Sequence, residues 1–130
     1  FVKLLLARRL LRSTEHERQR LSLNQLMRQA KYSWHGVKLN QPDWGDDSHS
    51  IAFSAEIRGE GLFFHMIFNA YWGPLEFDLP PLNNGRENPW RRWIDTSLDS
   101  PYDIVEWQTA PSIPGYTYRA EARTVVVLYA

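Results

Sequence analysis

A continuous apolar run from Leu62 to Phe68 is the feature that most constrains the fold of this chain. Strand residues alternate between the two faces of a sheet, so a run that is apolar on both faces predicts a strand covered on both sides. After the turn expected at Gly73-Pro74, residues 75–79 alternate between apolar and acidic, which predicts a strand with one face in water. Together these runs predict a β-hairpin at the heart of an antiparallel sheet.

The period of two begins near Tyr32 and recurs to the end of the chain in short segments separated by turn residues. Further strands are expected at 51–57, 90–96, 104–107, 116–120 and 124–128. Gly36 shifts the alternation between Trp34 and Val37, which predicts a β-bulge, with Trp34 as a packing anchor at a sheet edge. The fold class is therefore mainly β: an antiparallel β-sandwich of seven or eight strands.

A short helical N-terminal segment precedes these strands. Its apolar residues recur at helical spacing, and the capping spacings Thr14-x-x-Glu17 and Ser22-x-x-Gln25 mark helix starts. Residues 1–31 carry eight basic and two acidic side chains, a net charge of +6, whereas the remainder carries −6. We therefore predict two parts, a helical segment at 1–31 and a β-sandwich at 32–130.

Five segments resemble, in the same order, the C-terminal end of isoamylase-type glycogen debranching enzymes of the α-amylase superfamily. They are Trp34-His35-Gly36, Gln41-Pro42-Asp43-Trp44, the Asn69–Pro81 stretch, Ile94-Asp95-Thr96 and Ala122–Leu128. The resemblance implies an antiparallel β-sandwich preceded by the last helix of a catalytic (β/α)8 barrel. The start at Phe1, without an initiator Met, fits a fragment of such an enzyme.

The resemblance implies that the parent enzyme hydrolyses α-1,6 branch linkages of glycogen or a related glucan with a pair of carboxylates. The catalytic motifs of the barrel do not occur in this sequence, so no catalytic residue is assigned and the chain is expected to be non-catalytic. Glu76 and Asp78 alternate with core positions and are interpreted as residues on the solvent-exposed face of a strand. The expected role is structural support of the upstream catalytic barrel, with glycogen or maltodextrin as a partner through the parent enzyme.

The alternative is a glucan-binding module that uses exposed Trp and Tyr rings. Aromatic residues are numerous, and Trp90, Trp93 and Trp107 are the candidate carbohydrate-binding residues. We favour domain-interface packing for most of these rings, because aromatic side chains of a sandwich are usually buried.

Metal and cofactor sites are not predicted. The loop Asp43–Ser48 is rich in acidic residues but lacks the order of a calcium loop, so it is interpreted as an Asx turn. The four histidines share no ligand spacing, and His65 is expected in the core.

The remaining composition restricts partners and compartment. The basic segment lacks interleaved aromatic residues, which argues against nucleic acid, and no apolar stretch is long enough to span a membrane. The absence of cysteine fits a reducing compartment, the cytoplasm or, in a plant, the plastid.

Overall fold

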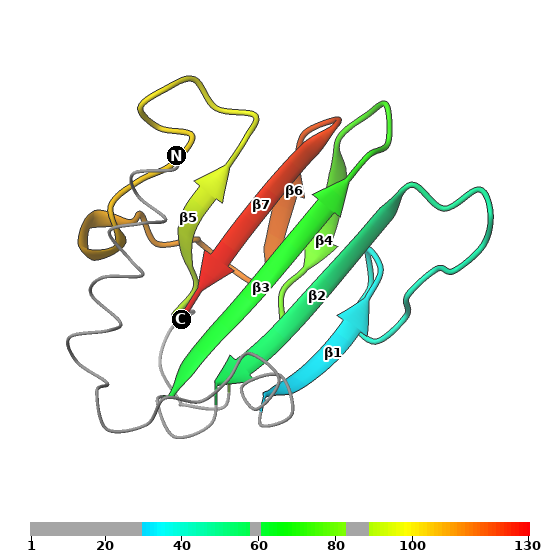
Figure 1. The fold of residues 1–130 in the computed structure, drawn as a ribbon, viewed down its shortest axis with the longest axis horizontal. Helices are drawn as coiled ribbons and strands as arrows, with labels where there is room; N and C mark the ends of the chain where they lie inside the picture. The colour runs from blue at the N-terminus through cyan, green and yellow to red at the C-terminus, as the bar shows by residue number, and fades with distance from the viewer. Residues whose placement is uncertain (1–29, 58–60, 83–88) are drawn as a thin grey trace. The chain divides into compact units, whose positions relative to one another are not determined.

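The computed structural model describes residues 30–57, 61–82 and 89–130, and residues Lys31–Ala130 form one compact unit. Seven strands lie in this described part: β1 (Lys31–His35), β2 (Ser50–Ile57), β3 (Leu62–Asn69), β4 (Leu75–Asp78), β5 (Arg91–Asp95), β6 (Thr117–Ala120) and β7 (Thr124–Tyr129). The helix in the same residues is the single 3-10 turn η1 (Trp107–Thr109) (Figure 1). The predicted helical segment at 1–31 lies almost wholly outside the described residues, and the division at residue 31 stays a prediction.

The strands form two antiparallel sheets, as the alternating pattern predicts. One sheet has the order β1-β2-β3-β7-β5, and the other pairs β4 with β6. Figure 1 shows the smaller sheet behind the larger one. Strand β3 is the middle strand of the larger sheet, which confirms that its apolar run belongs to a central strand.

The predicted hairpin between 62–68 and 75–79 is wrong. Strand β3 pairs with β2 and β7, whereas β4 pairs with β6, with Leu75 opposite Ala120. The chain crosses between sheets because the buried Asn69 side chain fixes the connection. Its Nδ2 donates to the carbonyls of Gly73 (3.1 Å), Ala120 (3.2 Å) and Glu121 (2.9 Å), and its Oδ1 accepts from the amide of Tyr71 (3.1 Å).

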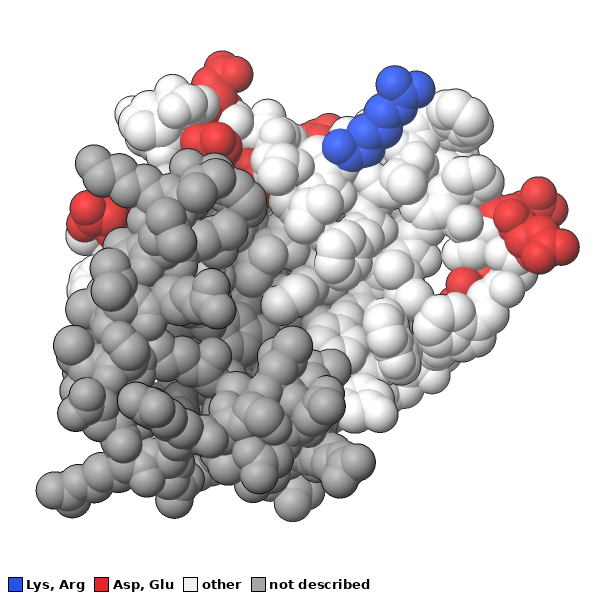
Figure 2. All heavy atoms as spheres, in the orientation of Figure 1, with Lys and Arg blue, Asp and Glu red and all other residues white. Residues whose placement is uncertain are grey.

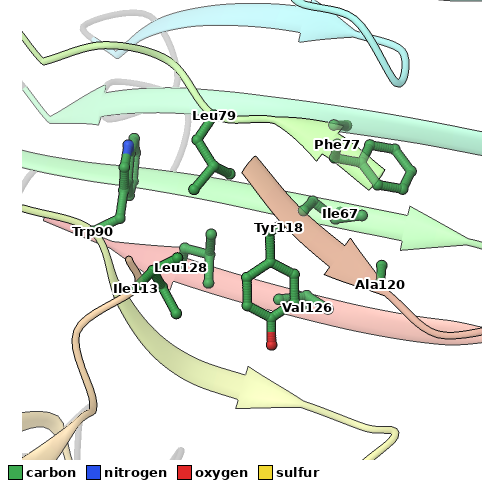
Figure 3. Close-up of a cluster of buried hydrophobic side chains, with 10 residues drawn as sticks. Ile67, Phe77, Leu79, Trp90, Ile113, Tyr118, Ala120, Val126 and Leu128 are labelled. Carbon is green, nitrogen blue, oxygen red and sulfur yellow. The ribbon is translucent and has the colours of Figure 1, made fainter. Parts of the chain in front are cut away.

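The core between the two sheets draws on both of them. Figure 3 shows Phe77 and Leu79 from the β4 segment and Tyr118 and Ala120 from β6 packed over Ile67, Val126 and Leu128 of the larger sheet, with Ile113 and Trp90 at one end. The inward alternation predicted for 75–79 is confirmed, since Phe77 and Leu79 are buried while Glu76 is exposed.

One buried carboxylate ties the two sheets together. Asp95, at the end of β5, accepts hydrogen bonds from the Tyr118 hydroxyl of β6 (2.5 Å) and the Ser97 hydroxyl (2.6 Å). Burial, together with the hydrogen bond to Asp95, raises the pKa of Tyr118 well above its ordinary value. The next residue, Thr96, accepts from the amide of Val125 at 2.9 Å, so the Ile94-Asp95-Thr96 motif is a set of structural ties.

Two local predictions are corrected. The strand expected at 104–107 is a single bridge from Ile104 to Ile94 of the edge strand β5. The chain then turns into η1 and lays its apolar side chains on the face of the sheet, so the pairing goes no further. The bulge expected at Gly36 is absent, since the β1–β2 register is regular from Lys31 to His35; the register shift lies between Arg92 and Ile94.

Candidate functional site

The larger sheet has an unusual distribution of polarity. Alternation places one set of side chains away from the smaller sheet, and we call this set the outer apolar face. On β1, β2, β3 and β7 it contains no charged residue, and its members there are Tyr32, Trp34, Ile51, Phe53, Ala55, Ile57, Leu62, Phe64, Met66, Phe68, Val125, Val127 and Tyr129. On β5, Arg91 lies opposite Tyr129 on the same side. The inward face of the same strands carries the polar residues, among them His35, Ser54, His65 and Asn69.

One part of the outer apolar face is covered by the segment 104–110. Trp107 stacks on Tyr129 with ring centroids 3.6 Å apart, and it contacts Phe64 and Trp93 at 5.9 Å and 5.3 Å. The Tyr129 hydroxyl donates to the carbonyl of Trp107, and burial raises the pKa of Tyr129. This half of the face is therefore an internal hydrophobic cluster.

The other part of the face, over β1, β2 and β3, is exposed. Tyr32 and Trp34 are 55% and 43% exposed, and both rings contact Phe53, at 6.1 Å and 4.9 Å. Phe68 is 40% exposed. Figure 2 views the molecule from this side: its described surface is mostly uncharged, with acidic side chains at the right and the upper left and one basic side chain at the top.

A hollow of about 350 Å³ lies at the end of this exposed region. Its lining includes Ile51 and Phe68 of the outer apolar face, the exposed ring of Trp44, and the polar residues Asp43 and His49. Trp44 meets Trp34 edge-on at 5.6 Å, so the hollow continues the aromatic surface of β1.

The loop that carries Trp44 is held by its own hydrogen bonds. The amide of Gly45 donates to Oδ1 of Asp43 (3.0 Å), and the amide of Ser48 donates to the carbonyl of Gly45 (2.9 Å). The Asx turn predicted for Asp43–Ser48 is thus confirmed. In the described residues, no group of three or more His, Cys, Asp or Glu side chains could hold a metal.

A second exposed tryptophan lies beyond His49. The His49 ring is 6.0 Å from that of Trp72, which is 70% exposed and has the Arg123 guanidinium 6.0 Å from its centroid. The connection that carries Trp72 is the one fixed by Asn69, and the amide of Arg123 donates to the carbonyl of Tyr71 (3.2 Å). The Trp44 loop that lines the hollow and the neighbouring Trp72 connection are therefore each held by hydrogen bonds.

A polar chain crosses the interior below β1, β2 and β3. The amide of Asn40 donates to Nδ1 of His35 (2.8 Å), so the proton of the neutral His35 ring is on Nε2, which donates to the Ser54 hydroxyl (2.9 Å). That hydroxyl is left to donate to Nδ1 of His65 (2.8 Å). His35 of the Trp-His-Gly motif is therefore a structural residue.

His65 is fully buried, and its Nε2 has no hydrogen-bond partner among the described residues. Burial, and then the charge that His35 can carry, lower the pKa of His65 to about 3. Burial also lowers the pKa of His35. The expectation of a core position for His65 is confirmed, but only one of its ring nitrogens is satisfied.

The three tryptophans predicted to contact carbohydrate are not brought together on an open surface. Trp90 is 1% exposed in the core, where its Nε1 donates to the carbonyl of Pro80 (2.9 Å). Trp93 is 6% exposed and packs against the half-buried Trp107. Their role in carbohydrate binding stays a prediction.

The exposed rings Trp34, Trp44 and Trp72 were not the favoured candidates in the sequence. For Trp72 a signal existed, because a tryptophan directly before Gly-Pro occupies a turn, where a large apolar side chain has little core to enter. Its pairing with His49 depends on strands distant in sequence and has no local signal.

A membrane span is not found in the described residues, since no helix there has the length and hydropathy to cross a bilayer.

Comparisons with known proteins give a consistent result. Residues 33–126 match the family described as "Isoamylase 1-3, C-terminal". The chain is 29% identical over 99 residues to Isoamylase SU1, chloroplastic, of Zea mays, covering 75% of this chain and 12% of that protein. It is 36% identical over 77 residues to Isoamylase 1, chloroplastic, of Oryza sativa subsp. japonica (55% and 8%), and 29% identical over 108 residues to Isoamylase 1, chloroplastic, of Arabidopsis thaliana (82% and 12%). The chain thus spans about an eighth or less of the length of these relatives.

Proposed function

Because the chain belongs to the isoamylase C-terminal domain family, we propose that it is a non-catalytic domain of a glycogen- or starch-debranching enzyme and supports the catalytic barrel. The catalytic domain, elsewhere in the longer protein, hydrolyses α-1,6 branch linkages. In a plant this enzyme acts in the plastid, in keeping with the chloroplastic relatives, and otherwise in the cytoplasm.

The observation that carries the structural role is the polarity of the larger sheet. Its inward side chains include a histidine pair and an asparagine, whereas the outer apolar face has no charged member on four strands. A sheet face that met only water would carry polar side chains. The exposed rings of Tyr32 and Trp34 support burial of the β1 side of this face against another domain.

Three acidic residues make hydrogen bonds or ion pairs within the domain, and these contacts support a non-catalytic role. Asp95 is the one buried carboxylate among the described residues, and it is occupied by Tyr118 and Ser97. Asp78 pairs with Lys38 at 3.4 Å, and Glu121 pairs with Arg119 at 2.9 Å. Hydrolysis by a retaining mechanism requires two carboxylates about 5 Å apart on either side of a glycosidic bond, with the acid in an environment that raises its pKa.

The test compares two tyrosines of nearly equal exposure. Tyr32, 55% exposed, lies on the outer apolar face, and Tyr116, 51% exposed, lies next to β6 of the other sheet. In the 130-residue chain, Tyr32→Ser and Tyr116→Ser should each change the free energy of unfolding by no more than about 0.5 kcal/mol. In the complete debranching enzyme, Tyr32→Ser should cost about 1–2 kcal/mol, the contribution of burying a large side chain, while Tyr116→Ser should remain neutral.

Two outcomes contradict the proposal. Equal effects of the two variants in the complete enzyme would mean that the outer apolar face is not an interdomain surface. Release of reducing ends from glycogen by the 130-residue chain, abolished by replacing one of its acidic residues, would mean that the chain is catalytic.

A further inference from the structure

We propose that the hollow beside Trp44 is a binding site for a segment of α-glucan chain. Trp44 forms one wall, Ile51 and Phe68 form an apolar floor, and His49 leads on to Trp72. The choice of α-glucan among neutral carbohydrates rests on the proposed function, and the site itself rests on the following observations.

The first observation is the exposure of two indole rings. Trp44 and Trp72 are 65% and 70% exposed, the highest values among the tryptophans of the described residues. Tryptophan in a folded domain is normally highly buried, so two such rings near one hollow call for a ligand. A pyranose ring has apolar C–H faces that stack on an indole and hydroxyl groups that remain at the edge.

The second observation is the charge of the lining. The residues that line the hollow include one acidic side chain, Asp43, and no lysine or arginine. Such a lining does not attract phosphate, nucleic acid or an acidic peptide. A neutral ligand rich in hydroxyl donors suits it, because the Asp43 carboxylate and the Ser48 hydroxyl of the lining have oxygen atoms that can accept hydrogen bonds.

The third observation is that the segments carrying Trp44, in the lining, and Trp72, beside the lining residue His49, are held by hydrogen bonds before any ligand binds. The Trp44 loop is closed by the Gly45 and Ser48 amides, and the Trp72 connection is held by Asn69. Rings held in place lose little conformational entropy on binding, so a shallow site retains useful affinity. An open hollow also suits a polymer, whose chain enters and leaves along the surface.

The test is a titration of maltoheptaose into the isotope-labelled 130-residue chain, followed by amide NMR. We expect saturable shifts confined to residues 43–51 and 68–73, with a Kd of about 1 mM. Trp44→Ala and Trp72→Ala should each weaken binding about tenfold, the loss typical of an aromatic anchor. Trp44→Phe, which keeps a flat ring, should retain most of the affinity, which separates lost stacking from lost folding.

Controls separate this site from the packing role of the outer apolar face. Tyr116→Ala and Tyr32→Ser should leave maltoheptaose affinity unchanged, while Tyr32→Ser is the variant that tests interdomain packing. Equal affinity for cellohexaose would overturn the assignment to α-glucan. Absence of saturation, or shifts centred on Trp90, Trp93 and Trp107 instead, would overturn the site.

Discussion

Acidification should destabilise this domain through His65. The ring is fully buried and its pKa is lowered from 6.5 to about 3, so the unfolded chain binds a proton at this residue more readily than the folded chain does. The free energy of unfolding therefore falls as the pH drops below 6.5, and the fall ends near pH 3, where the folded state also takes up the proton. Above pH 6.5 the ring is neutral in both states and contributes no pH dependence.

The size of the effect follows from the shift. Each pH unit between the two pKa values is worth about 1.4 kcal/mol, so lowering the pH from 7.5 to 5.5 costs on the order of 1 kcal/mol and to 4.5 on the order of 3 kcal/mol. Carboxylates also titrate at the lower end of this range, so the comparison has to be made between variants. In the variant, His65 is replaced by Asn, whose amide oxygen can still accept a hydrogen bond from the Ser54 hydroxyl.

The assay is urea unfolding at pH 7.5, 6.5, 5.5 and 4.5, followed by tryptophan fluorescence. His65→Asn should be less stable than the wild type at pH 7.5, because a smaller side chain leaves space in the core, but its stability should fall much less between pH 7.5 and 5.5. Asn69→Ala, at a buried residue that does not titrate, should lower the stability at every pH and keep the wild-type pH dependence. Parallel curves for the wild type and His65→Asn would refute the reasoning.

Two further substitutions test the backbone ties. Gly36→Ala should cost about 2 kcal/mol or more in urea unfolding, because the added Cβ would lie 2.4 Å from the carbonyl oxygen of Gln41, whereas Gly73→Ala, with its nearest contact at 3.7 Å, should cost less than about 1 kcal/mol; similar costs would contradict the close-approach argument. Asn69→Ala removes the donor to three backbone carbonyls and should cost about 3 kcal/mol by the same assay, while a cost under about 1 kcal/mol would mean that water replaces the side chain without loss.

The β-strands were largely predictable because each carries its own alternation. Strand β2 and the inward positions Phe77 and Leu79 follow the period-two pattern directly, and the apolar run of β3 correctly indicates a central strand. These signals are local, because the alternation of residues along one strand determines which side chains lie on each face.

The pairing of strands was not predictable in the same way. The turn before β4 resembles a hairpin turn, but Asn69 bonds to carbonyls more than fifty residues away in the chain, and those bonds send β4 to the other sheet. The same limit applies to the candidate site. The β1–β2 loop and the β3–β4 connection bring the rings of Trp44 and Trp72 near one hollow. The sequence of neither segment predicts that it lies close to the other.

The reversed polarity of the larger sheet has a consequence for how damage to this domain would appear. The interior between the sheets is closed by the domain's own residues, so a substitution in the exposed part of the outer apolar face, such as Tyr32→Ser, leaves that interior intact. The separate domain would then show normal spectra, normal unfolding and normal yield. The defect would be measurable only in the complete enzyme, as a shorter lifetime of the folded protein. Substitutions of the inward polar residues, such as Asn69→Ala, would instead lower the stability of the separate domain itself.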